Sequence, residues 1–167
     1  MAIQDNTLPP NSRQIPLTKG KFSIVDEADY EWLSKKKWCA HHCRGRFVAV
    51  HNYRKGGKMI HVQMHRLIMQ PSAGMQIDHI NGDTLDNRRC NLRICTNAEN
   101  CRNRKYKESV HGYKGVAPVR NGRWGARICI NYRQSWLGSY DTIEEAARAY
   151  NEAAIRIHGN YALLNNV

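Results

Sequence analysis

One short stretch in the middle of the chain contains the side-chain types that hydrolysis of a phosphodiester bond requires. An acid and a histidine are adjacent at Asp78 and His79. Two asparagines follow at Asn91 and Asn100. A histidine with its ordinary pKa of about 6.5 can remove a proton from water near neutrality. Carboxylate and amide oxygens are ligands that suit Mg²⁺ or Mn²⁺.

The same stretch resembles the His-Asn-His (HNH) nuclease family, in its variant with asparagine at the third position. The resemblance is carried by the Asp78-His79 doublet, the tripeptide NLR that begins at Asn91, and the run from Thr96 to Asn100, which ends in Glu-Asn. It implies that His79 is the general base and that Asn91 positions its ring. It also implies that Asp78 and Asn100 bind a Mg²⁺ or Mn²⁺ ion, with zinc less expected beside an amide ligand.

Other polar residues near this motif have simpler interpretations. Asp83, Asp86 and Asn87 are of types that form turns, and we assign them no chemistry. His61 and His65 are four residues apart, which on a helix would be the spacing of a metal-ligand pair. The similar nucleases have a histidine at the His65 position that looks structural, and we expect the same here.

The charge of the chain indicates a polyanionic partner. There are 26 Lys and Arg residues against 14 Asp and Glu, a net charge of +12 in 167 residues. Such a surplus is typical of a protein that binds nucleic acid, although a solvated charged surface is the alternative. The cations are concentrated in the middle, where we expect Arg93, Arg102 and Arg104 to contact double-stranded DNA beside the nuclease motif.

The last third of the chain has the pattern of three short strands and a helix. Apolar residues alternate over 113–119, 123–130 and 135–140. Thr142 and Glu145 form a capping box at the start of a helix that Gly159 ends. The segments YKGV, WLGSY, EEAARAYNEAA and HGNYALLN resemble the DNA-binding domain of plant Apetala and ethylene-response-factor (AP2/ERF) proteins. That domain also occurs attached to nucleases of mobile elements and phages.

A two-residue period predicts which side chains of this sheet face DNA. Arg123 and Arg127 lie on one face of the middle strand, while Trp124, Ala126 and Ile128 lie on the other face and pack on the helix. The same alternation in the third strand places Leu137 inside and Trp136 outside, where it would be an exposed aromatic residue. The DNA-binding candidates of this domain have cationic or aromatic side chains: Lys114, Arg123, Arg127 and Trp136. Several positions depart from the plant domains, so the plant target sequence cannot be carried over; these are Ala117, Val119, Asn121 and Cys129.

These patterns predict an α+β protein with two folded domains. We expect a flexible tail over 1–14 and then an HNH nuclease domain over 15–105, with its ββα-metal core at about 61–105. A linker over 106–112 leads to an AP2/ERF-like domain over 113–167, in which a small three-stranded antiparallel sheet packs on one helix. Short apolar runs over 22–25, 47–50 and 59–64 and a helical turn over 29–36 make the region before the motif strand-rich. A capping box of Thr96 and Glu99 starts a helix at Asn97, which carries Asn100.

Cysteine usage and hydropathy predict an intracellular protein. No apolar run reaches the ~18 residues that cross a bilayer, and the amino terminus lacks a secretory signal pattern. We expect a cytoplasmic protein, in a phage-infected host cell if the resemblance extends to origin. The six cysteines are then reduced, and none has the paired C-x-x-C spacing of a zinc site, so structural Zn²⁺ is not expected.

The function that these features predict is a site-specific DNA endonuclease of the homing type. One rival is a sequence-specific DNA-binding regulator whose nuclease half is inactive. Another is an RNA-binding protein stabilised by zinc. The sequence leaves four properties open: the target sequence, the choice between a nick and a double-strand cut, the physiological metal, and the oligomeric state, for which a monomer is one option.

Overall fold

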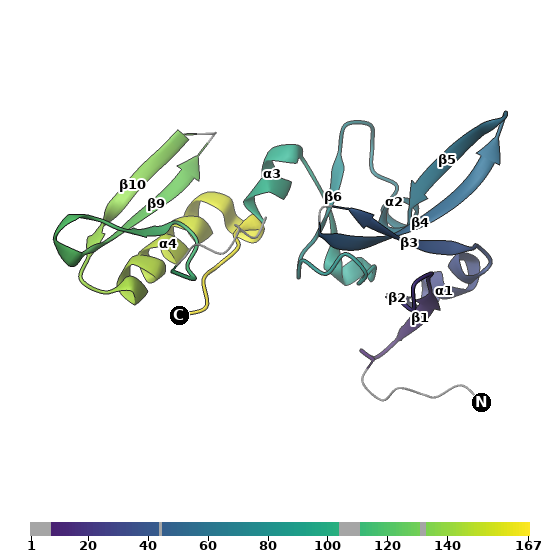
Figure 1. The fold of residues 1–167 in the computed structure, drawn as a ribbon, viewed down its shortest axis with the longest axis horizontal. Coiled ribbons are helices and arrows are strands. Elements are labelled where there is room, and N and C mark those ends of the chain that lie inside the picture. The colour runs from purple at the N-terminus through teal and green to yellow at the C-terminus, as the bar shows by residue number, and fades with distance from the viewer. Residues whose placement is uncertain (1–7, 44, 104–110, 131–132) are drawn as a thin grey trace. The chain divides into compact units, whose positions relative to one another are not determined.

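The computed structural model describes residues 8–43, 45–103, 111–130 and 133–167 (Figure 1). The chain folds into two compact units, Met1–Cys95 and Thr96–Val167. Among the described residues, the first unit contains three small antiparallel sheets and the second contains one, and both contain helices, which agrees with the predicted mixture of helix and strand. The expected linker over 106–112 falls largely outside the described residues.

The first unit begins with a hairpin of β1 (Ser12–Pro16) and β2 (Phe22–Asp26), followed by α1 (Glu27–Ser34). Strand β1 starts inside the segment that we expected to be a flexible tail. Its Ile15 is almost fully buried, because it packs in the core of this unit. The ordered chain therefore begins before residue 15.

A second sheet has the order β3-β4-β5, with β3 at Trp38–Cys43, β4 at Arg46–Lys55 and β5 at Lys58–Gln63. Helix α2 (Met64–Met69) follows β5 without a loop. His61 lies in the strand and His65 in the helix, so these two histidines do not share a helix on which their spacing could form a metal-ligand pair.

The nuclease motif lies on a two-stranded sheet of β6 (Gln76–His79) and β7 (Leu92–Cys95), with η1 (Arg89–Asn91) directly before β7. Apolar residues of every sheet in this unit meet in one core cluster. Its buried members are Ile15, Leu17, Val25, Leu33, Trp38, Ala40, Ala49, Met64, Ile68, Ile77 and Leu92. The motif is thus built on a packed scaffold and not on a surface loop.

Helix α3 (Asn97–Arg102) opens the second unit. Its predicted capping box is present: the Thr96 side chain accepts from the Glu99 amide, and the Glu99 carboxylate accepts from the Thr96 amide at 2.8 Å. Strand, strand and helix follow one another along the chain in the order that a ββα motif requires.

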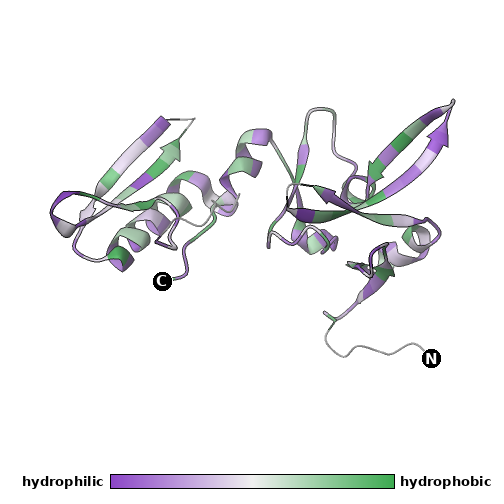
Figure 2. Cartoon of the chain, in the orientation of Figure 1, coloured by the Kyte–Doolittle hydropathy of each residue, from purple (hydrophilic) through white to green (hydrophobic). Residues whose placement is uncertain are grey.

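The rest of the second unit is one sheet, ordered β10-β9-β8, and one long helix. Its elements are β8 (Val116–Pro118), η2 (Arg120–Gly122), β9 (Trp124–Ile130), β10 (Arg133–Tyr140), α4 (Ile143–His158) and η3 (Gly159–Tyr161). The three predicted strands and the Thr142 capping box are all confirmed. Figure 2 shows how hydrophobic and hydrophilic residues alternate along these elements.

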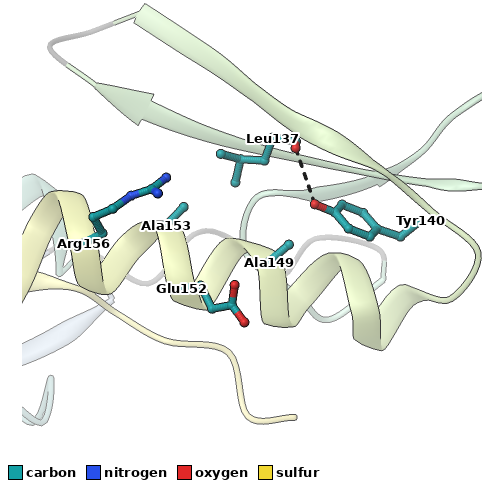
Figure 3. Close-up of a pocket in the computed structure, with 6 residues that line it drawn as sticks. All are labelled: Leu137, Tyr140, Ala149, Glu152, Ala153 and Arg156. Carbon is teal, nitrogen blue, oxygen red and sulfur yellow. Dashed lines mark hydrogen bonds between the residues drawn. The ribbon is translucent and has the colours of Figure 1, made fainter.

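Alanines let α4 approach the sheet closely. Ala146, Ala147 and Ala154 are fully buried against residues of β8 and β9 such as Val116 and Ile128. A hollow remains where α4 faces β10 (Figure 3). It is lined by Leu137, Tyr140, Ala149, Glu152, Ala153 and Arg156.

Candidate functional site

The predicted acid and base lie at the end of β6 and are both buried. Asp78 is 7% exposed and His79 is 6% exposed. Antiparallel pairing places Asp78 opposite Arg93 and His79 opposite Leu92. Because these positions belong to a hydrogen-bonded sheet over a packed core, both side chains are held by the scaffold.

The His79 ring is oriented by Asn87. Its Nε2 lies 3.3 Å from the Asn87 side-chain oxygen, and the His65 ring meets it edge-on with a centroid separation of 5.1 Å. Burial lowers the pKa of His79 below 6.5, and the Asn87 hydrogen bond and the Asp78 carboxylate offset part of that shift. The imidazole is therefore neutral near pH 7, as a general base must be.

Asn87 is itself locked in place, and we had assigned it only to a turn. Its side-chain nitrogen donates to the Ser23 hydroxyl at 2.7 Å, and its main-chain nitrogen donates to the Ile24 carbonyl at 2.7 Å. Both partners lie on β2, far away in sequence. The residues next to Asn87 in the sequence do not indicate its role, because that role depends on contacts with the distant strand β2.

Asn91 has partners other than the His79 ring. Its side-chain oxygen accepts from the Asn81 amide at 3.0 Å, and its side-chain nitrogen donates to the Asp86 carbonyl at 2.8 Å. Asn91 thus closes the loop between β6 and β7. We therefore reassign it from orienting the ring to holding the loop that carries Asn87.

Asp78 is paired with Arg93 across the sheet. Arg93 Nε and Nη2 donate to the same carboxylate oxygen of Asp78 at 2.8 Å and 2.5 Å. Both side chains are largely buried. This pairing gives Arg93 a role at Asp78, and its expected contact with DNA stays a prediction.

The remaining residues predicted near the motif belong to the second unit. Asn100 lies on α3 and is half-buried. Arg102 is the last residue of this helix, and Asn103 is the C-cap of the helix. Arg104 lies outside the described residues. Asn100 is thus on the first helix after the two strands, as predicted, but in the other compact unit.

The two predicted metal ligands are oxygen donors of the kind that suits a hard divalent cation. Asp78, in the first unit, offers a carboxylate oxygen, and Asn100, in the second, offers an amide oxygen; each type suits Mg²⁺ and Mn²⁺. Arg93 already neutralises Asp78, so a cation at this carboxylate would compete with a guanidinium. Among the described residues, no group of three or more His, Cys, Asp or Glu side chains is arranged as a metal site.

His65 has an unsatisfied ring nitrogen beside the candidate base. It is buried, and its Nδ1 has no hydrogen-bond partner within the described part of the chain. Burial, with the nearby His79 and Arg66, lowers the pKa of His65 to about 3. His65 is therefore a neutral packing partner for His79, in line with the structural role that we expected.

The second unit presents an outward face on β9 and β10. Trp136 is 56% exposed and lies opposite Arg127 in the strand register. Arg127 also donates to the Gln134 side chain at 3.3 Å. A Cβ atom at Gly125 would collide with the Trp136 ring, so the glycine leaves room for the indole to lie over the strand. The exposure predicted for Trp136 is confirmed.

Two further DNA-binding candidates in this unit have partners. Arg123 forms an ion pair with Asp141 at 3.1 Å and donates to the Ser139 carbonyl, but it remains exposed. Lys114 is half-buried, and its ammonium group donates to the Arg102 carbonyl at 2.7 Å. Burial lowers the pKa of Lys114. This hydrogen bond ties Lys114 to the last turn of α3, and its expected contact with DNA stays a prediction.

The six cysteines, all within the described residues, have free thiols. Among the helices described, none combines the length and the apolar character that a membrane crossing needs.

Comparison with known proteins identifies the region around the site. Residues 62–102 match the model of an HNH endonuclease family. An uncharacterized HNH endonuclease of Acanthamoeba polyphaga mimivirus is 27% identical over 151 residues, covering 89% of this chain and 77% of the viral protein. The region that contains Asp78, His79, Asn91 and Asn100 therefore matches an HNH endonuclease domain.

Other relatives match only a segment. An AP2/ERF and B3 domain-containing protein of Oryza sativa subsp. japonica is 51% identical over 53 residues, and an AP2/ERF and B3 domain-containing transcription repressor of Arabidopsis thaliana is 47% identical over 53 residues. These matches cover 32% of this chain but only 14% and 15% of the plant proteins. The chain is thus similar to an HNH endonuclease over most of its length and to AP2/ERF proteins over about a third of it.

Proposed function

We propose that the protein is a metal-dependent, site-specific DNA endonuclease of the homing type. The single observation that carries the proposal is the buried Asp78-His79 pair, with Asn87 holding the His79 ring, inside the region that matches the HNH family. A neutral, oriented imidazole beside a carboxylate is an arrangement suited to proton removal from water.

The hydrogen bond to Asn87 selects the tautomer of His79. The Asn87 oxygen can only accept, so Nε2 carries the hydrogen and Nδ1 carries the lone pair. Nδ1 takes a proton from water, the water oxygen bonds to phosphorus, and the bond from phosphorus to the leaving oxygen breaks. The leaving oxygen then takes a proton from solvent.

Asp78 and Asn100 are the residues that would hold Mg²⁺ or Mn²⁺. The bound ion would neutralise charge that grows on the phosphate during attack. When no ion is bound, the hydrogen bonds from Arg93 keep the Asp78 carboxylate oriented.

The second unit supplies recognition of double-stranded DNA in this proposal. Arg127, Gln134 and Trp136 share one face of the sheet, and they combine a cation, an amide and an aromatic ring. Such groups contact phosphates, base edges and sugars. The similarity to AP2/ERF proteins over about a third of the chain supports the same role.

One observation favours the alternative of a DNA-binding regulator with an inactive nuclease half. The Asp78 carboxylate already accepts two hydrogen bonds from Arg93, which could exclude a metal ion. Cleavage decides between the two functions. An endonuclease converts supercoiled plasmid to nicked or linear product with Mg²⁺ or Mn²⁺ and stops with EDTA, whereas a regulator binds DNA under both conditions without cutting it.

The His79→Ala variant tests the assignment of the base. Loss of a general base typically lowers the rate by about 10²–10⁴. Its DNA affinity should be unchanged, because His79 is buried. The matched control is His41→Ala, which removes an exposed histidine of the same unit. Wild-type cleavage by His79→Ala would contradict the proposal.

A further inference from the structure

A long part of the first unit contains cations and no acids. Between Trp32 and Ile77 the sequence has no Asp or Glu. The cations of this stretch are Lys35, Lys36, Lys37, Arg44, Arg46, Arg54, Lys55, Lys58 and Arg66. The positive charge of the protein is therefore not confined to the region around and after the nuclease motif.

Three of these cations gather at the end of a two-stranded ribbon. Strand β3 pairs with β4 only as far as His51, whereas β4 and β5 remain paired out to Lys55 and Lys58. We call residues 52–61 the ribbon; Figure 1 shows β4 and β5 running out together to its tip. Gly56 and Gly57 form its turn with φ values of 56° and 76°, as a type I′ hairpin requires.

The ribbon contributes nothing to the core of its unit. The core cluster takes Ala49 from β4 and no residue from 52–61, all of which are described. Tyr53 is 40% exposed and Met59 is 51% exposed. Arg54, Lys55 and Lys58 are exposed, and the described part of the chain offers none of them an ion-pair partner. Packing therefore does not explain this pattern of side chains.

The dimensions and chemistry of the ribbon fit a groove of duplex DNA. A paired stretch of four residues per strand extends about 13 Å, and the major groove, about 12 Å wide, admits a two-stranded ribbon. Cations at the tip complement phosphates, while the Asn52 and His61 side chains, joined by a 2.7 Å hydrogen bond, add polar groups. Tyr53 and Met59 add apolar surface that can meet sugars or thymine methyl groups.

The ribbon is also joined directly to the candidate site. Strand β5 continues without a loop into α2, and α2 carries His65, whose ring meets His79. DNA held by the ribbon is therefore held by the same unit that carries the candidate base. We propose that the ribbon is a DNA-binding element of the nuclease unit, with Arg54, Lys55 and Lys58 contacting phosphates of the duplex.

The test compares two triple variants of the full chain. One is Arg54→Gln, Lys55→Gln and Lys58→Gln. The matched control is Lys19→Gln, Lys35→Gln and Lys37→Gln, which removes the same charge from exposed positions elsewhere in the unit. Fluorescence anisotropy with a labelled mixed-sequence duplex in EDTA measures affinity at several salt concentrations. Each lost phosphate contact lowers the slope of log affinity against log salt by about 0.9, so the ribbon variant should lose up to about 2.7.

Equal slopes for the ribbon variant and the wild type would overturn the inference, as would equal losses in the two triple variants. Tighter binding of a single strand or an RNA of the same sequence would also overturn it. Circular dichroism checks folding, and the double variant Lys55→Gln, Lys58→Gln replaces the triple if that one unfolds. The inference rests on the proposed function, but their failures differ. A wild type that neither binds nor cuts DNA refutes the function, whereas one that does both and has an unaffected ribbon variant refutes only the ribbon.

Discussion

The side-chain oxygen of Asn87 lies 3.3 Å from Nε2 of His79, while the nitrogen of the same amide donates to Ser23. One buried amide therefore connects the candidate base to the hairpin at the start of the ordered chain. This makes the first hairpin part of the support of the site. It also separates two tasks: Asn87 orients the ring, and Asn91 holds the loop.

The pH profile of cleavage should depend on Asn87. Since burial lowers the pKa of His79, the wild-type rate should fall only below about pH 6.5. Asn87→Ala removes an interaction that raises this pKa, so the midpoint should move lower and the rate should drop. Asn87→Asp adds a carboxylate, so the midpoint should move higher. Single-turnover rates against pH measure both shifts. Asn121→Asp makes the same chemical change at an exposed position and should leave the midpoint unchanged. Identical pH profiles for the wild type, Asn87→Ala and Asn87→Asp would refute the role of Asn87.

The metal requirement should depend on Asp78 and Asn100. Asp78→Asn removes the charge of one proposed ligand, and Asn100→Ala removes the oxygen of the other. Each variant should need more Mg²⁺ or Mn²⁺ for half-maximal cleavage, which a metal titration of the rate measures. Asn103→Ala changes the C-cap of the same helix and should not alter the requirement. If Asp78→Asn and Asn100→Ala behave like this control, these two ligands are misassigned.

The stability of the first unit should fall in mild acid because of His65. Its pKa is about 3 in the folded chain against 6.5 for the free side chain, so between these values the unfolded state binds a proton that the folded state does not. This contribution to the free energy of unfolding is complete above about pH 6.5 and is lost as the pH falls. The loss reaches about 2 kcal/mol at pH 5. His65→Phe keeps the ring and removes the titrating group. Urea unfolding of both proteins at several pH values should show a flatter pH dependence for the variant, and parallel curves would contradict the prediction.

Lys114 and Arg127 should respond differently to loss of charge. Lys114→Gln breaks the hydrogen bond to the Arg102 carbonyl, so it should lower the melting temperature and leave the salt slope of DNA binding unchanged. Arg127→Gln should reduce that slope by about 0.9 without a comparable loss of stability. Thermal melting and binding at several salt concentrations measure the two effects. A reduced salt slope for Lys114→Gln would identify Lys114 as a DNA contact.

Local patterns in the sequence determined most of the secondary structure of the second unit. The capping boxes at Thr96 and Thr142 are present, and alternation along β9 and β10 correctly predicted that Ile128 is buried and that Trp136 is exposed. These features depend on residues two to four positions apart. Propensity and periodicity act over that range, so they can be inferred from sequence alone.

Only the tertiary structure decided which side chains meet at the site. The motif identified Asp78 and His79, but the partner of each came from elsewhere: Arg93 from the opposite strand and Asn87 from a loop anchored to Ser23. The same holds for Lys114, whose charge suggested DNA and whose burial against Arg102 gives it a structural role. A buried polar group must find a partner wherever packing places one. That partner depends on the packed arrangement of distant segments, which spacing along the chain does not encode.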